Sequence, residues 1–188
     1  GSEARVLLLS GTGSCAYGRS RDGRTVKFGG RGHILGDQGS ASDIALVALR
    51  RIVYQHDLKE KFPPLGHAVL RALQLNHPDD LIPWTQAAAK QDIAALAITV
   101  FDEARRGDEL AREVLRNAAE KLADMALHCA AHLVATRARV QFLLAGGVLL
   151  KHRSFAAAVS RRLHEHWHKC RVVRLRRESV WGAVELAR

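Results

Sequence analysis

The chain has 188 residues, of which 47% are hydrophobic and 26% are charged. This balance is typical of one globular domain with its own core, and it excludes a disordered chain. Lysine and arginine outnumber aspartate and glutamate by 29 to 19, which gives a formal net charge of +10. The excess favours anionic partners such as phosphates, although a solvated basic surface would explain it as well.

Two further classes of protein are disfavoured. No run of about eighteen or more apolar residues occurs, so we expect no membrane span. The three cysteines, Cys15, Cys129 and Cys170, are scattered and form no CxxC pair. This pattern argues against a disulfide framework and for a reducing compartment, so we expect a cytoplasmic protein.

The N-terminal part of the chain predicts strands and tight turns. Residues 6–9 form a short apolar run that ends at Ser10-Gly11, as expected of a buried strand. Residues 14–19 and 25–28 flank Asp22-Gly23, which is a strong signal for a two-residue hairpin. The expected order is therefore strand, glycine loop, strand, hairpin and strand.

Helices are expected through the middle of the chain. Ser40 or Ser42 can cap a first helix whose apolar positions continue to Val53, and Pro63-Pro64 breaks the chain after it. Gly107 is placed as a helix C-cap. The helices expected after the proline pair cover residues 65–75, 79–89, 92–106 and 108–133.

The C-terminal part returns to alternating strands and helices. The expected elements are a strand at 140–144, a turn at Gly146-Gly147, a helix at 155–166, a strand at 172–175 and a closing helix at 181–186. Residues 1–188 therefore predict a single α/β domain with a mixed sheet and a helical insertion at about residues 58–135.

The first glycine loop, residues 11–14 (GTGS), directly follows the first expected strand. Glycines there let backbone N–H groups approach an oxyanion, and Thr12 and Ser14 add hydroxyl donors. With the next two residues the string also fits the dinucleotide fingerprint G-x-G-x-x-A. That fingerprint needs a helix to open at the loop, whereas a hairpin is expected here, so we predict a phosphate cradle and reject a dinucleotide fold.

The second glycine loop, residues 29–40, ends where the Ser40 helix is expected to begin. The positive N-terminus of that helix would then face whatever the loop holds. Asp37 can accept hydrogen bonds from sugar hydroxyls or hold a hydrated metal ion. His33 could bond a substrate, although an isolated histidine is more often structural. Alone, this loop is as often a turn as a binding loop, and its pairing with the first loop favours binding.

Two weaker signals lie near the C-terminus. Gly146-Gly147 after a strand would let a flat ring lie against the backbone, although any strand-to-helix turn can use glycine. His164 and His168 share a helix face with the spacing of metal ligands. They lie in a basic run in which Glu165 is the only acid, so we expect a solvated helix end and no metal site.

Together these motifs resemble a known family. A strand ending in GTGS, a DG hairpin and GGRGHILGDQGS before a helix resemble the C-terminal lobe of eukaryotic-type N-acetylglucosamine kinases. These kinases belong to the family named for the BadF/BadG/BcrA/BcrD ATPases. Gly107-Asp108, Ala145-Gly146-Gly147-Val148 and Trp181-Gly182-Ala183 follow in the family's order. The resemblance covers essentially the whole chain and implies a ribonuclease-H-like C-terminal lobe of the actin/hexokinase-type ATPase fold.

The resemblance also implies the ligands and their positions. It implies ATP with Mg²⁺ as phosphate donor and an N-acetylated amino sugar, of the N-acetylglucosamine or N-acetylmuramate type, as substrate. The implied ATP-binding residues are Gly11, Thr12 and Gly13 of the second phosphate loop, and Gly146 and Gly147 of the adenosine motif. The implied sugar-binding residues are Ser14, Cys15, Gly30, Gly32, His33 and Asp37. No metal ligand is assigned in this chain.

Two departures from the family qualify this assignment. The family usually has tryptophan where Arg31 stands, which leaves the identity of the sugar open. Its catalytic aspartate and first phosphate loop precede the GTGS strand. We therefore expect this chain to hold no general base, to supply one lobe, and to need a partner N-terminal lobe to complete the active site.

Other functions remain to be weighed. The runner-up is a non-catalytic sugar- or nucleotide-binding module that regulates a larger cell-wall-sugar-recycling protein. Residues 73–84 resemble a bacterial subgroup fused to an N-acetylmuramate 6-phosphate etherase domain. Nucleic-acid binding by the basic residues of segment 137–177 is a weaker alternative. The scattered cysteines do not suggest the bridging iron–sulfur cluster of the family's activators, and the sequence leaves open whether the protein is a homodimer.

Overall fold

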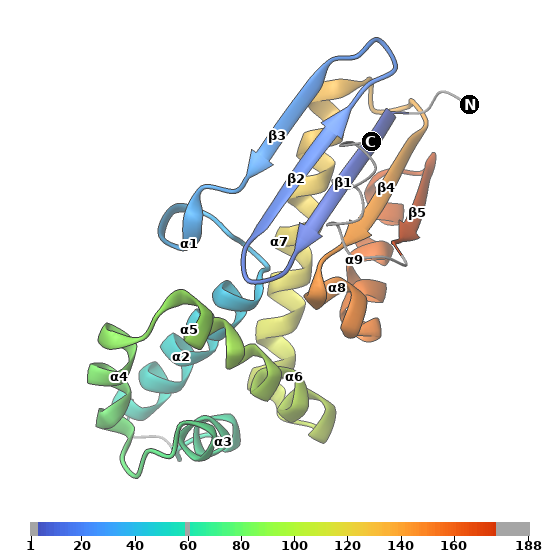
Figure 1. Cartoon of the computed structure of the whole chain (residues 1–188). Helices are drawn as coiled ribbons and strands as arrows, with labels where there is room; N and C mark the ends of the chain where they lie inside the picture. Colours follow the sequence, from blue (N-terminus) through green and yellow to red (C-terminus); the bar gives the residue numbers. More distant parts are fainter. Residues whose placement is uncertain (1–3, 59–60, 176–188) are drawn as a thin grey trace.

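The computed structural model describes residues 4–58 and 61–175, which form a five-stranded sheet and a group of helices (Figure 1). The strands are β1 (Ala4–Ser10), β2 (Ser14–Arg19), β3 (Thr25–Gly29), β4 (Val140–Ala145) and β5 (Cys170–Arg174). Their order in the sheet is β3-β2-β1-β4-β5. The first three strands pair antiparallel, whereas β4 runs parallel to both β1 and β5. The predicted α/β fold with a mixed sheet is therefore confirmed.

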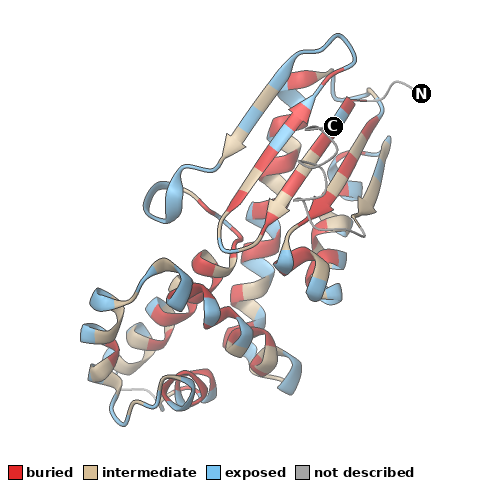
Figure 2. Cartoon of the chain, viewed as in Figure 1, coloured by how far each residue is buried: buried red, intermediate tan, exposed pale blue. Residues whose placement is uncertain are grey.

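The centre of the sheet is formed by its most apolar strands, β1 and β4. Val6 and Leu8 of β1 and Phe142 and Leu144 of β4 are fully buried. Burying each such side chain contributes about 1.5–3 kcal/mol. Figure 2 shows this buried strip running along the sheet and continuing into the helices. The apolar runs seen in the sequence thus become the two strands that end at the first glycine loop and at the Gly146-Gly147 turn.

The hairpin between β2 and β3 is longer than predicted. Ser20 donates its backbone N–H to the carbonyl of Arg24 over 2.9 Å, so the loop has three residues between this pair. Asp22 accepts from the Ser20 hydroxyl and pairs with the Arg24 guanidinium, and Gly23 has φ +89°. Three-residue loops with glycine in the left-handed region are common in hairpins. The Asp-Gly pair was therefore a correct hairpin signal with the wrong loop length.

Nine α-helices and one 3₁₀ turn occur among the described residues. They are α1 (Gly32–Leu35), α2 (Ala41–Asp57), α3 (Pro64–Leu73), η1 (Pro78–Asp80), α4 (Leu81–Ala87), α5 (Lys90–Ala95), α6 (Ala97–Arg106), α7 (Glu109–Leu133), α8 (Gly147–Lys151) and α9 (Arg153–His166).

The structure corrects several of the helix boundaries. The helix expected at 79–89 ends at Ala87, because Ala88 and Ala89 are extended and the carboxylate of Asp92 accepts from the Ala89 N–H. The helix expected at 92–106 is divided at Leu96, whose N–H bonds to the nearer carbonyl of Ile93 in a tighter turn. The short helices α1 and α8 were not predicted. The closing helix expected at 181–186 lies outside the described residues.

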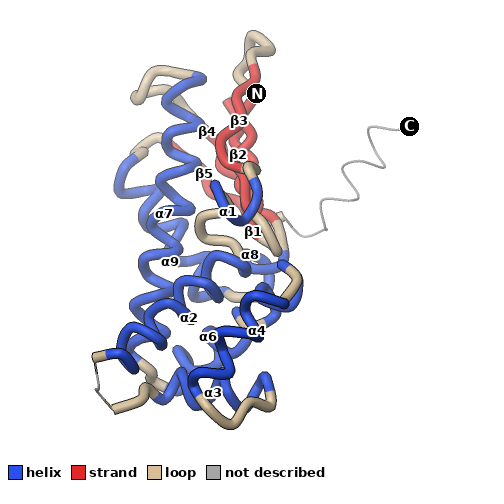
Figure 3. Tube along the Cα trace, turned by 90° about the vertical axis from the view of Figure 1, so that its left-hand side faces the viewer, coloured by secondary structure: helices blue, strands red, loops and turns tan. Residues whose placement is uncertain are grey.

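The long helix α7 connects the helical group to the sheet. Gly107, with φ +103°, ends α6, and Asp108 caps α7 by accepting the Ala111 N–H over 2.8 Å. Further along the helix, Cys129 and Leu133 pack closely against Gly18 of β2, where a larger residue would clash. Figure 3 shows α7 and α9 covering one face of the sheet. The boundaries of the helical insertion stay a prediction, and the structure places the C-terminal part of α7 on the sheet.

The described residues also bear on membrane association. None of their helices combines the length and the apolar character that crossing a bilayer requires.

Candidate functional site

The first glycine loop and the Gly146-Gly147 turn lie side by side at one end of the sheet. Because β1 and β4 are parallel and Leu9 pairs with Ala145, the residues that follow each strand meet at the same edge. Gly146 has φ +89°, and a side chain on it would clash with the backbone of Ser10. Glycine is therefore required at Gly146 both by its backbone conformation and by the close approach of the two turns.

The second glycine loop folds back onto the first. The Ser14 hydroxyl donates to the carbonyl of Gln38 over 2.7 Å, and the Ser10 hydroxyl donates to that of Gly39 over 2.8 Å. The Ser42 hydroxyl in turn donates to the carbonyl of Thr12 over 2.8 Å. These serines are buried or hold buried partners, so the bonds fix the two loops as one rigid unit.

The N-terminus of α2 is bonded to both glycine loops. The Ala41 N–H donates to the carbonyl of Gly11 over 2.8 Å, and the Ser40 hydroxyl accepts from the Asp43 N–H. The Asp43 carboxylate accepts from the Gly39 N–H over 2.8 Å. These groups are satisfied by the protein, so this end of the helix joins the two glycine loops. The expectation that the helix N-terminus faces the contents of the second loop stays a prediction.

Two backbone donors remain at the tip of the first glycine loop. Gly11 donates its N–H to the carbonyl of Gly13 over 2.9 Å, which closes the turn. Among the described residues, the N–H groups of Thr12 and Gly13 have no acceptor. No atom lies within 4 Å of the position that a Cβ would take on Gly11 or Gly147. The open space beside Gly11 and Gly147 leaves room for an anion to approach this end of the sheet.

Asp37 lies directly beneath the first glycine loop. Its side chain is 4% exposed, and its φ of +60° is unusual for a residue other than glycine. Its Oδ1 accepts the Ser14 N–H over 3.1 Å, and a Cβ on Gly13 would lie 2.9 Å from the same oxygen. The structure thus brings Asp37 together with Gly13 and Ser14 of the predicted phosphate cradle.

The cation that pairs with Asp37 could not be foreseen from the sequence. Lys90, the first residue of α5, places its Nζ 2.6 Å from Oδ2 of Asp37. The two residues are 53 positions apart, and Lys90 belongs to no motif. The pair joins the helical group to the glycine loops and balances the buried charge of Asp37. Only a three-dimensional arrangement reveals it.

The remaining predicted site residues are less tightly grouped. Cys15 is half-buried on β2, and Gly30 donates its N–H to the carbonyl of Ser14 over 3.0 Å. Gly32 and His33 are exposed on α1, next to the exposed Arg31. Figure 1 shows α1 projecting from the segment between β3 and α2. The structure therefore groups Cys15 and Gly30 with the cradle and leaves Gly32 and His33 on an exposed turn.

The described residues offer little to hold a metal ion directly. They contain no group of three or more histidine, cysteine, aspartate or glutamate side chains that could hold one. Asp37, the carboxylate nearest the cradle, already binds Lys90 and the Ser14 N–H. A metal that acts at this site would therefore depend on ligands other than a protein cage, as Mg²⁺ does when it binds through phosphates and water.

The sheet order and the paired glycine loops define a ribonuclease-H-like lobe of the sugar-kinase and actin type. Residues 1–187 match the BadF/BadG/BcrA/BcrD ATPase family, and the chain belongs to this family.

Curated relatives carry kinase names. The chain is 30% identical over 185 residues to the N-acetylmuramic acid/N-acetylglucosamine kinase of Clostridium acetobutylicum, covering 97% of this chain and 60% of that protein. It is 33% identical over 123 residues to the N-acetyl-D-glucosamine kinase of Dictyostelium discoideum, covering 64% of this chain and 39% of that protein. The chain therefore spans about 60% or less of the length of these relatives.

Solved structures agree with the fold. A protein of Chromobacterium violaceum, provisionally described as an N-acetylglucosamine kinase, matches with a TM-score of 0.74 and 26% identity. The match covers 99% of this chain and 60% of that one. A protein of Porphyromonas gingivalis with the same provisional description matches with a TM-score of 0.68 and 14% identity, over 98% of this chain and 60% of that one. The second likeness supports the fold alone.

Proposed function

We propose that the protein containing this chain is an ATP-dependent kinase of an N-acetylated amino sugar of the N-acetylglucosamine or N-acetylmuramate type. Membership of an ATPase family and the kinase names of its relatives support this proposal. The observation that carries it is the pair of unengaged N–H groups on Thr12 and Gly13, held above the Asp37–Lys90 pair. This chain would supply the phosphate loop, the adenosine turn and part of the sugar site.

The first glycine loop would position the phosphates of ATP. Phosphoryl transfer is catalysed mainly by positioning and by stabilisation of charge, so backbone donors in a rigid loop suit the reaction. Thr12 and Gly13 would donate to phosphate oxygens, and Gly147 leaves room for the nucleoside to approach the backbone. When bound, Mg²⁺ would neutralise part of the phosphate charge.

Asp37 would accept hydrogen bonds from hydroxyl groups of the sugar. An ionised carboxylate has about four acceptor positions, and Ser14 and Lys90 occupy two of them. Lys90 would also neutralise the charge of Asp37. Without Lys90, that carboxylate would repel the phosphates of ATP bound at the first glycine loop. Lys90 is therefore a positioning residue in this proposal, acting through Asp37.

The general base is expected on the partner lobe. Asp37 is buried and paired with Lys90, which makes it a poor acceptor for the proton of the attacking hydroxyl. The other carboxylate near the loops, that of Asp43, accepts from Gly39 within the protein. An ATP-consuming reaction on a free amino sugar also suits the cytoplasm. The etherase fusion suggested by residues 73–84 stays a prediction.

The test is sugar-dependent release of ADP by the full-length protein that contains this chain. With ATP and Mg²⁺ present, N-acetylglucosamine or N-acetylmuramate should release one ADP per sugar, and mass spectrometry should detect the sugar phosphate. A regulatory module would bind ATP or sugar without releasing ADP. That result, with correctly folded protein, would replace the kinase proposal by the regulatory alternative.

A further inference from the structure

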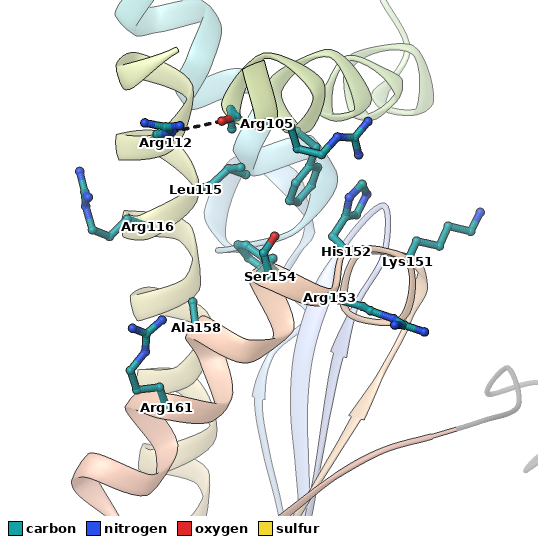
Figure 4. A pocket seen from close by; sticks show the side chains of 13 residues that line it. Arg105, Arg112, Leu115, Arg116, Lys151, His152, Arg153, Ser154, Ala158 and Arg161 are labelled. Atoms are coloured by element: carbon teal, nitrogen blue, oxygen red, sulfur yellow. Dashed lines mark hydrogen bonds between the residues drawn. The ribbon is translucent and has the colours of Figure 1, made fainter. Parts of the chain in front are cut away.

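A second concave site lies between α6, α7 and the α8–α9 segment. It has a volume of about 810 Å³, within the range of pockets that bind small molecules. Its lining includes none of the residues of the two glycine loops and neither Gly146 nor Gly147. Figure 4 shows helices bordering it on several sides. It is therefore separate from the site proposed for ATP and sugar.

The rim of this pocket is strongly basic. It carries Arg105, Arg112, Arg116, Lys151, Arg153 and Arg161. Figure 4 shows Arg116 and Arg161 toward the α7 side and Lys151 and Arg153 across the pocket from them. The cations thus surround the pocket and do not line a single helix face.

Most of this charge has no partner in the protein. Arg105 pairs with Asp102, and Arg112 pairs with Glu109, each over 2.7 Å. Within residues 4–58 and 61–175, the other four rim cations form no ion pair with a carboxylate. By contrast, Arg162, the neighbour of Arg161, is held by Asp124 over 2.8 Å. The unbalanced cations attract an anion into the pocket.

The floor of the pocket is aromatic and largely uncharged. The rings of Phe101 and His152 stack with their centroids 3.5 Å apart and an interplanar angle of 8°. Phe155 packs edge-on against Phe101 at 5.6 Å. Burial lowers the pKa of His152, and the charges of Arg105 and Lys151 lower it further, against the opposing effect of Asp102. The lowered pKa favours the neutral form of His152, whose stacked ring then adds an uncharged surface to the pocket.

We propose that this pocket binds a small organic molecule carrying at least two phosphate groups. Cations on opposite sides suit two separated anionic groups, and arginine binds phosphate through paired N–H donors. The stacked rings would support the body of the molecule, and Ser154 adds an exposed hydroxyl. The concave shape, with cations on opposite sides, suits a small molecule better than a nucleic acid, whose phosphates need an extended basic track.

Binding here would reach the adenosine turn through α8. That helix has five residues, beginning at Gly147 of the turn and ending at Lys151 of the pocket rim. A ligand that draws Lys151 inward would therefore act on the helix that starts at the adenosine turn. The binding itself does not rest on the kinase proposal, whereas an effect on ATP affinity does.

Calorimetric titration of the full-length protein with pyrophosphate tests the binding. Arg116→Gln combined with Arg161→Gln should lower the affinity of the pocket for pyrophosphate by at least about tenfold, because each charge-assisted hydrogen bond contributes strongly to binding. Arg50→Gln combined with Arg137→Gln is the matched control, since it removes the same charge from exposed positions outside the pocket. The control should change affinity by less than about threefold.

A second arm separates the pocket from the ATP site. ATP should still raise the Tm of the Arg116→Gln/Arg161→Gln variant, which also shows that the variant folds. Should that variant fail to fold, Ser154→Glu provides a second test, because it introduces a negative charge at an exposed position of the pocket. It should weaken pyrophosphate binding as much as the double arginine substitution is expected to. Equal pyrophosphate affinity in rim and control variants would overturn the proposal. Displacement of pyrophosphate by a single-stranded oligonucleotide at lower concentration would also overturn it, in favour of a nucleic-acid surface.

Discussion

At the scale of single residues, Asp37 and Lys90 connect parts of the chain that the sequence keeps far apart. Asp37 belongs to the second glycine loop, so its neighbours in the sequence allow it to be predicted as a site residue. Lys90 is one of many lysines and arginines in a chain of net charge +10, so nothing in the sequence distinguishes it. Its role becomes visible only when its Nζ is found 2.6 Å from the buried carboxylate.

Lys90→Met should lower the kcat/KM of the full-length protein for ATP by about tenfold, because the Asp37 charge would then face the phosphates unbalanced. Lys90→Arg should restore most of the activity. Gln91→Met is the control, since it places the same side chain at an exposed position of α5. Steady-state kinetics measure the effect, and Tm values check that each variant folds. If Lys90→Met and Gln91→Met behave alike, Lys90 has no positioning role.

Gly146 and Gly147 should respond differently to substitution by alanine. Gly146→Ala should destabilise the fold, because its backbone is left-handed and its side chain would meet Ser10. Gly147→Ala should leave the Tm of the free protein unchanged, since no atom lies within 4 Å of the added Cβ. It should instead weaken nucleotide binding, measured as loss of the Tm shift that ATP produces. Full retention of that shift would remove Gly147 from the nucleotide site.

At the scale of elements, the sequence predicted best where local signals were strong. The buried strands, the Ser40 cap of α2, the Gly107 stop and the Asp108 start of α7 all agree with the structure. Short elements were missed, because α1 and α8 have only four and five residues and give little periodicity. The division at Leu96 was also missed, since no proline or glycine marks it.

The capped start of α2 gives a prediction on stability. Ser40→Ala should lower the free energy of unfolding by about 1 kcal/mol, because it removes the side chain that accepts the Asp43 N–H. Ser40 is also fully buried, so the lost bond is not replaced by water. Thr136→Ala, at an exposed loop position, is the control and should change stability little. Denaturant unfolding measures both, and equal values would show that the cap contributes nothing.

At the scale of the whole molecule, the order of the motifs along the sequence was enough to predict the fold class. It was not enough to predict how the helices are arranged. The site gathers residues from both ends of the chain because β1 and β4 are parallel neighbours. The basic pocket draws its cations from α6, α7 and the α8–α9 segment, so their grouping depends on how those helices pack. No sequence pattern records such packing, although the dense arginines hinted at an anionic partner.

The central claim is that the two glycine loops and the Gly146-Gly147 turn form one site for ATP and an amino sugar. Hydrogen–deuterium exchange on the full-length protein tests it most directly. ATP should slow exchange in peptides covering residues 10–15 and 145–149, and N-acetylglucosamine or N-acetylmuramate should slow it in peptides covering residues 28–38. Slowed exchange confined to other segments, at saturating ligand, would contradict the claim.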